Sequence, residues 1–236
     1  MSMEVRVGRL LTVVMCLGLG LGAVGAPRPG IAGATPLSRE AAPAHVAVIG
    51  DSYTTGTDEG GQGAKGWAAR TWQSLARQGV AIAPDVAAEG GAGYGVRGNH
   101  GSVFIDLAAR AVHRDDALVV FYGSRNDQPV DPARLAVLAR NAFVLARRTA
   151  PAARLLVIGP PWPTPNVPPV VLRIRDVLRT QALAAGATFF DPIVAGWFFG
   201  RSDLIGPDGV HPTDAGHAYM ADRIAPLISS QLPRST

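Results

Sequence analysis

The sequence predicts an α/β domain of three layers, in which helices cover both faces of a central parallel sheet of about five strands. Short apolar runs rich in β-branched residues alternate with amphipathic segments of about ten residues or more. Glycine or another turn residue follows most of these runs. Of the 236 residues, 47% are hydrophobic and only 17% are charged, so the chain has enough apolar side chains for one large core.

The strands are predicted from runs that are buried on both faces of a parallel sheet and therefore read as continuously apolar. The first lies at 46–49 and stops at Gly50. The other four are predicted at 80–88, 117–122, 155–159 and 188–190.

The helices are predicted from the 3.6-residue spacing of apolar side chains and from their end signals. Asp131 followed by Pro132 is a typical start for the longest helix, and Thr213 is a predicted N-cap for the last one. The predicted helices span 67–78, 106–113, 131–150, 169–185 and 213–232.

The first 34 residues are predicted to be a signal peptide. Arg6 and Arg9 precede the uncharged apolar run 10–21, and small residues up to Ala34 supply a cleavage site. The run is shorter than the about 20 apolar residues that cross a bilayer, so we expect no membrane span in the mature chain. The protein is therefore expected to be secreted or held in the cell envelope, with an uncleaved N-terminal anchor as the alternative.

Residues 35–44 are rich in alanine and proline and have no apolar period, which predicts a flexible tether. The folded domain is then expected to occupy residues 45–236. We expect it to be a monomer.

Composition excludes several classes of function. The single cysteine, Cys16, excludes a disulfide framework within the chain and a cysteine-based zinc site. The formal net charge is +4, and half of it comes from the predicted signal peptide, so the domain carries too little positive charge for a nucleic-acid partner. No metal or organic cofactor is implied.

Ligands of parallel sheets bind beyond the carboxyl ends of the strands, so the residues that follow strands are the functional candidates. Ser52 stands shortly after the first predicted strand, where it is a candidate nucleophile if a base activates it. The alternative is a helix cap, which serine and aspartate also favour. Thr54 takes the place of the last glycine of a Gly-x-Ser-x-Gly elbow, which argues against an α/β-hydrolase fold.

Asp208 and His211 form an Asp-x-x-His pair near the C-terminus, in which the carboxylate can orient the imidazole of a general base. The alternative is a hydrogen-bonded pair that only ties the loop. In that case Asp214 and Asp191 are the next carboxylates to consider.

Two loops can supply hydrogen-bond donors to a developing oxyanion. Asn126 follows the third predicted strand and carries a side-chain amide. The glycine-rich segment 89–94 follows the second strand and can offer a backbone N–H. Each loop alone is also typical of an ordinary turn.

These four motifs, in this order, resemble the SGNH, or GDSL-type, hydrolase family of esterases, lipases and acyltransferases, and the resemblance extends over residues 45–232. It implies the flavodoxin-like fold of that family and acyl transfer through a serine ester. It also implies the following roles: Ser52 as nucleophile and first oxyanion donor, Gly93 as second donor, Asn126 as third donor, His211 as base, and Asp208 as its partner.

The chain departs from the family pattern in three places. Two residues separate Gly123 from Asn126 where the family has one, so Arg125 is a candidate substrate contact. The glycine loop lacks the usual preceding asparagine, which makes Gly91 a rival of Gly93 as donor. Tyr53 stands where the family name has leucine, and it is a second candidate contact with the substrate.

A third candidate contact is Trp162, in a proline-rich segment that follows the fourth predicted strand. Its ring can stack on a sugar or an acyl chain, or it can pack against its own domain as part of a lid. The aromatic run 197–199 can line an apolar pocket or, alternatively, belong to the core.

Three classes of function remain open at the level of the sequence. The first is a secreted carboxylic ester hydrolase acting on a small-molecule ester or an acylated glycan, with a preference for acyl chains of modest length because the chain has no long lid insertion. The second is an acyltransferase that uses the same centre to pass the acyl group to a sugar hydroxyl. The third is a non-catalytic carbohydrate-binding domain.

Overall fold

The computed structural model describes residues 42–233. The predicted signal peptide and most of the predicted tether lie outside these residues. The first strand begins at Ala44, so the final residue assigned to the tether already belongs to the sheet.

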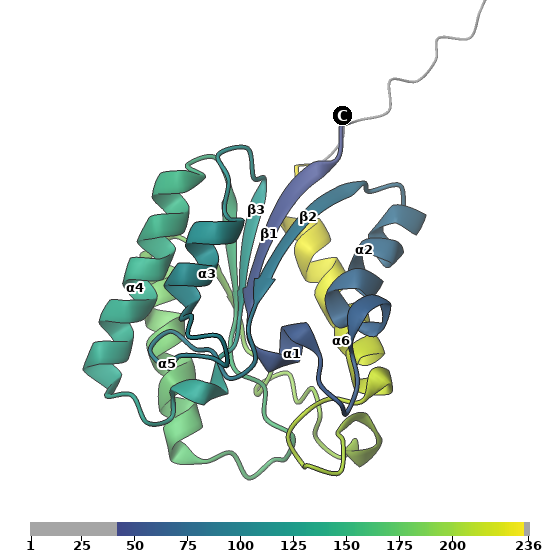
Figure 1. Cartoon of the computed structure of the whole chain (residues 1–236), viewed down its shortest axis with the longest axis vertical. Helices are drawn as coiled ribbons and strands as arrows, with labels where there is room; N and C mark the ends of the chain where they lie inside the picture. Colours follow the sequence, from purple (N-terminus) through teal and green to yellow (C-terminus); the bar gives the residue numbers. More distant parts are fainter. Residues whose placement is uncertain (1–41, 234–236) are drawn as a thin grey trace, which may run out of the picture. The chain divides into compact units, whose positions relative to one another are not determined.

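A parallel sheet of five strands forms the centre of the described domain (Figure 1). The strand order is β2-β1-β3-β4-β5, with every neighbouring pair parallel, which confirms the predicted fold class. The strands are β1 (Ala44–Gly50), β2 (Ile82–Ala88), β3 (Leu118–Tyr122), β4 (Arg154–Ile158) and β5 (Thr188–Phe190).

Helices cover both faces of this sheet. In Figure 1, α3, α4 and α5 lie on one face, and α2 and α6 lie on the other. The α-helices are α1 (Ser52–Thr55), α2 (Trp67–Arg77), α3 (Phe104–Ala111), α4 (Pro132–Thr149), α5 (Pro169–Ala184) and α6 (Asp214–Gln231). Single 3-10 turns are η1 (Gly63–Lys65), η2 (Arg125–Asp127) and η3 (Ser202–Leu204). None of the helices between residues 42 and 233 combines the length and apolar character needed to cross a membrane.

Two apolar cores form because successive side chains of a strand point to opposite faces. Ala47 and Ile49 of β1 belong to the core under α3, α4 and α5. Val46 and Val48 belong to the core under α2 and α6. All four side chains are fully buried, which is why β1 has no polar alternation in its sequence.

The predicted starts of α4 and α6 are correct because their capping side chains are in place, whereas α3 begins at Phe104, before its predicted start at residue 106. The Asp131 carboxylate accepts hydrogen bonds of 3.0 Å from the backbone N–H groups of Ala133 and Arg134. The Thr213 hydroxyl accepts one of 3.1 Å from the Gly216 N–H. These bonds satisfy donors that a helix leaves free at its first turn.

The order of the strands determines where a ligand can bind. From β1 the chain passes to β2 at one side, and β3 then pairs with β1 at the other side. Such a reversal opens a crevice beyond the carboxyl ends of the two central strands. The segments that follow β1 and β3 therefore meet at this crevice.

Candidate active site

Ser52 is the first residue of α1 and immediately follows the capping residue Asp51. An oxygen of the Asp51 side chain accepts a 2.9 Å hydrogen bond from the Tyr53 N–H and so holds the turn after β1. The Ser52 hydroxyl oxygen lies 3.0 Å from Nε2 of His211. The nucleophile predicted from the sequence and the predicted base are thus in hydrogen-bond contact.

Asp208 contacts both the ring and the backbone of the histidine loop. Its Oδ2 lies 2.5 Å from Nδ1 of His211. Its Oδ1 accepts hydrogen bonds from the N–H groups of Val210 (2.8 Å) and His211 (2.9 Å). Partial burial raises the pKa of Asp208, but these bonds outweigh burial and hold the pKa below its ordinary value. The same carboxylate therefore ties the loop and faces the imidazole.

The two carboxylates considered as alternatives to Asp208 are engaged elsewhere. Asp214 pairs with Lys65 at 2.7 Å and accepts a hydrogen bond from the Gly61 N–H. Asp191 accepts hydrogen bonds from the two N–H groups that follow it closely, those of Ile193 and Val194. Asp208 is the carboxylate that contacts His211.

The side-chain amide of Asn126 is held at the end of β3 by contacts with two other loops. Its Nδ2 donates a 2.8 Å hydrogen bond to the Ala92 carbonyl and lies 3.5 Å from an oxygen of Asp51. The Ser124 hydroxyl accepts from the Asn126 N–H and donates to the same Ala92 carbonyl. The amide thereby lines the same cavity as Ser52.

The two glycines considered as oxyanion donors have different surroundings. The Gly93 N–H donates a 2.9 Å hydrogen bond to the Val96 carbonyl, and Gly93 is buried. Gly91 is partly exposed and lines the cavity with Ser52. The backbone of Gly91 has φ +78°, a conformation that favours glycine. Of the two glycines, Gly91 is the one that contributes to the cavity wall.

Two buried carboxylates that were given no role from the sequence shape the glycine loop. Asp127 accepts hydrogen bonds from the N–H groups of three successive residues, Tyr94, Gly95 and Val96. Burial raises the pKa of Asp127, and these three bonds oppose the rise. Glu89 likewise accepts hydrogen bonds from backbone N–H groups of the same loop, at His100 and Ser102. The sequence does carry a signal for the role of Glu89, because an acidic residue directly before a glycine-rich turn can accept hydrogen bonds from the backbone N–H groups of that turn.

Tyr53 is placed differently from the prediction that it contacts the substrate. Its side chain is only 2% exposed, because it packs against Tyr122, Phe198 and the His211 ring. Its hydroxyl donates a 2.5 Å hydrogen bond to the Val210 carbonyl, next to His211. Tyr53 therefore supports the histidine loop from beneath.

The other two candidate substrate contacts, Arg125 and Trp162, contact each other. The Arg125 guanidinium lies over the Trp162 ring, with Cζ 4.2 Å from the ring centroid. Arg125 also lines the catalytic cavity. Trp197 and Phe198 are 3% and 1% exposed, so they belong to the core rather than to a pocket.

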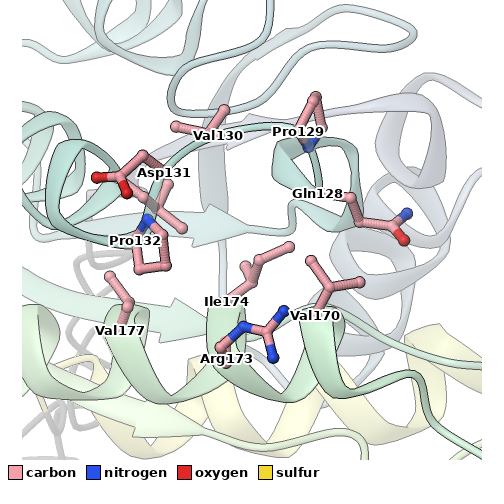
Figure 2. A pocket seen from close by; sticks show the side chains of 10 residues that line it. Gln128, Pro129, Val130, Asp131, Pro132, Val170, Arg173, Ile174 and Val177 are labelled. Carbon is pink, nitrogen blue, oxygen red and sulfur yellow. The ribbon is translucent and has the colours of Figure 1, made fainter.

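The catalytic cavity has a volume of about 700 Å³ and is largely polar. Asp58, Asn99 and His100 also form part of its wall. A second cavity of about 270 Å³ lies between the start of α4 and α5. Figure 2 shows Gln128 on one side of that second cavity and Val170 and Arg173 of α5 on the other. Gln128 lines both cavities.

The buried carboxyl of Asp51 predicts a pH-dependent stability. Burial raises its pKa to about 6, so the folded state holds a proton more tightly than the unfolded chain does. The stability that comes from the neutral form is complete below pH 3.8 and is lost as pH rises through about 6. Asp51→Asn keeps an acceptor for the Tyr53 N–H without a charge. Its free energy of unfolding should exceed that of the wild type by about 3 kcal/mol at pH 8 and match it near pH 3.5.

Urea unfolding at both pH values measures this difference. Asp222→Asn, which changes an exposed carboxylate on α6, is the control and should show no comparable dependence on pH. A variant of Asp51 that is less stable than the wild type at pH 8 would contradict the prediction.

The hydroxyl of Tyr53 predicts a positioning effect on the histidine loop. Tyr53→Phe leaves the ring in place and removes the donor to Val210, so kcat for an ester should fall roughly tenfold with little change in KM. Tyr122→Phe is the matched control, because the Tyr122 hydroxyl is buried beside Tyr53 with no hydrogen-bond partner among the described residues. Steady-state kinetics of both variants measure the effect. Equal kcat values for the two variants would remove this role from Tyr53.

Comparison with known proteins supports one family. The model of the GDSL-like lipase/acylhydrolase family matches residues 48–219. The chain is 62% identical over 226 residues to the GDSL lipase Rv0518 of Mycobacterium tuberculosis, covering 94% of this chain and 96% of that protein.

Two solved structures with low sequence identity share the fold. One is the psychrotrophic esterase EstA from Pseudoalteromonas sp., with TM-score 0.61, 14% identity, and coverage of 79% of this chain and 97% of that chain. The other is a family two carbohydrate esterase from Clostridium thermocellum in complex with cellohexaose, with TM-score 0.63, 18% identity, and coverage of 80% and 64%. Together with the family match, these findings show that the chain belongs to the GDSL-like lipase/acylhydrolase family and is a carboxylic ester hydrolase.

Proposed function

We propose that this ester hydrolase works through a serine ester, with Ser52 as nucleophile, His211 as base and Asp208 as the partner of the base. The observation that carries the proposal is the continuous contact from the Ser52 hydroxyl through both nitrogens of the His211 ring to the Asp208 carboxylate. A hydroxyl needs such a base to act as a nucleophile near neutral pH.

In the first step, the Ser52 oxygen forms a bond to the carbonyl carbon of the ester, and Nε2 of His211 takes the hydroxyl proton. The carbonyl oxygen becomes an oxyanion. Its proposed donors are the N–H groups of Ser52 and Gly91 and one N–H of the Asn126 amide. The N–H bonded to the Ala92 carbonyl stays in place and fixes the direction of the group, while the N–H offered to the oxyanion leaves its long, 3.5 Å hydrogen bond to Asp51. The carbon–oxygen bond to the alcohol then breaks, and the alcohol leaves with the proton from His211.

In the second step, water repeats the sequence in reverse. His211 takes a proton from the water as its oxygen adds to the carbonyl carbon of the acyl-enzyme, and it returns the proton to Ser52 as the acid leaves. In both steps, Asp208 stabilises the protonated imidazole of His211. It also holds the neutral ring in the tautomer whose Nε2 can accept a proton.

We propose hydrolysis rather than acyl transfer as the main reaction. Exposed residues, among them Thr55, Asp58 and Asn99, form part of the cavity wall, so water reaches the site freely. An acyltransferase must exclude water from its acyl-enzyme. The open cavity supports the hydrolase.

The polar cavity also supports a substrate with a polar alcohol, such as an acylated glycan, and an acyl group of modest length. The carbohydrate esterase with the similar fold is seen with cellohexaose, which is compatible with this class. Export through residues 1–34 remains part of the proposal, and the N-terminal sequence of the mature protein decides it.

The proposal predicts how activity depends on pH. The wild-type rate on a short-chain aryl ester should fall on acidification, because a general base must be free of a proton to accept the one on Ser52. The lowered pKa of Asp208 keeps that carboxylate charged until the pH falls below its ordinary range. Asp208→Asn removes the charge and allows the wrong tautomer of His211, so kcat should fall by up to about 10⁴. His211→Ala should abolish turnover.

The rates of Asp208→Asn and His211→Ala, measured across the pH range with folding checked by circular dichroism, test the roles of Asp208 and His211. Asp51→Asn serves as a control, because burial raises the pKa of Asp51 to about 6, and a variant without this carboxyl should still lose activity on acidification. A folded Asp208→Asn enzyme with nearly full activity would leave a Ser52 and His211 dyad instead.

A further inference from the structure

Arg125 stands out among the arginines of the described chain because it lines the cavity that contains Ser52 and makes no hydrogen bond to a carboxylate or a backbone carbonyl of residues 42–233. One terminal nitrogen of its guanidinium is buried and has no partner within hydrogen-bond distance there. A satisfied arginine looks different: Arg147 donates hydrogen bonds to the carbonyl oxygens of Ala153, Ala185 and Gly186. The neutral Tyr53 hydroxyl lies beside the guanidinium, whose charge opposes the rise that burial causes in the Tyr53 pKa, but it supplies no negative charge to balance Arg125.

The position of Arg125 places its charge at the chemistry. It directly precedes Asn126, and both residues line the cavity that contains Ser52 and His211. Arg125 is also partly exposed, so a ligand in the cavity can reach the guanidinium. Its stacking on Trp162, at 4.2 Å, limits the freedom of the side chain and presents a flat group.

The charges around Arg125 leave it without a counter-ion. No carboxylate of the described residues forms an ion pair with it, in contrast to Arg201, which pairs with Asp203. Of the two acidic residues in the cavity wall, Glu89 is occupied by the N–H groups of the glycine loop, and Asp58 is exposed to solvent. Within the described part of the chain, Arg125 is the only lysine or arginine that lines the cavity. A single guanidinium matches one carboxylate, which it can bind through two parallel hydrogen bonds.

We propose that Arg125, supported by Trp162, binds a carboxylate of the substrate, and that the natural substrate is an ester with a carboxylate near the scissile bond. This inference rests on the proposed esterase function. It assigns a specificity-determining role to one of the two residues that lie between Gly123 and Asn126. The carboxylate can belong to the alcohol part, as in an acylated uronic acid, or to the acyl part, as in the half-ester of a dicarboxylic acid.

Two pairs of substrates distinguish a carboxylate on the alcohol part from one on the acyl part. The first pair is 4-acetoxybenzoate and its methyl ester, which differ in a carboxylate on the alcohol side. The second pair is 4-nitrophenyl hemisuccinate and 4-nitrophenyl butyrate, which differ on the acyl side. The measured quantity is the ratio of kcat/KM for the charged ester to that for the neutral ester, which cancels a general loss of activity.

Arg125→Gln should lower this ratio about tenfold or more in one of the two pairs, since a hydrogen-bonded charge of this kind contributes at least that factor. Trp162→Leu should lower the same ratio, because it removes the ring on which the Arg125 guanidinium stacks. Arg173→Gln is the matched control: it removes an exposed arginine from the neighbouring cavity in Figure 2 and should leave the ratio unchanged. The pair that responds identifies the side of the substrate that carries the carboxylate.

Ratios that Arg125→Gln leaves unchanged in both pairs would overturn the proposal, as would an equal decrease with Arg173→Gln. In either case, hydrolysis of the neutral esters that is lost in Ser52→Ala would leave the esterase function standing. Hydrolysis that survives Ser52→Ala would instead reject the proposed function itself.

Discussion

The pairing of β1 with β3 is the constraint on which the candidate active site depends. In their register, Gly50 at the end of β1 lies opposite Tyr122 at the end of β3. Ser52 and Asn126 follow these two positions by a few residues, so the sheet brings the hydroxyl and the amide to one crevice. Neither residue needs a long loop to reach the other. The pairing is secured by fully buried side chains on both faces of the two strands, with Val48 and Val120 on one face and Ile49 and Phe121 on the other.

Carboxylates hold the loops that follow the strands at the active-site edge of the sheet. Asp51, Glu89, Asp127 and Asp208 each accept hydrogen bonds from backbone N–H groups of a loop at this edge. A turn that leaves the sheet exposes several donors, and one carboxylate can satisfy two or three of them at once. The cost is the desolvation of the charge, which explains why burial raises the pKa of both Asp51 and Asp127. The site is thus ordered by buried charge as well as by apolar packing.

The fold was predictable because its signals are local. Strands β3 and β4 are almost continuous apolar runs, and the helices α4 and α6 begin at the N-cap residues Asp131 and Thr213. The contact of Ser52 with His211 was predicted from the order of motifs and a family resemblance, since no local rule joins residues 159 positions apart.

The details of the loops were less predictable. Whether Gly91 or Gly93 offers a free N–H depends on the Val96 carbonyl, which closes the loop onto Gly93. Tyr53 was predicted to contact the substrate, but its neighbour in the fold, the Val210 carbonyl, comes from a loop far along the chain. Such choices depend on tertiary contacts that residue spacing does not record.

The central claim is that an acyl group passes through Ser52 to water. Mass spectrometry of the protein and its products during turnover of a short-chain aryl ester tests it most directly, with a sugar acceptor present in one sample and absent from the other. The account predicts an acyl adduct on the peptide that contains Ser52, loss of this adduct in Ser52→Ala, and free acid as the product in both samples. An adduct on another residue, or an acylated sugar as the main product, would contradict it.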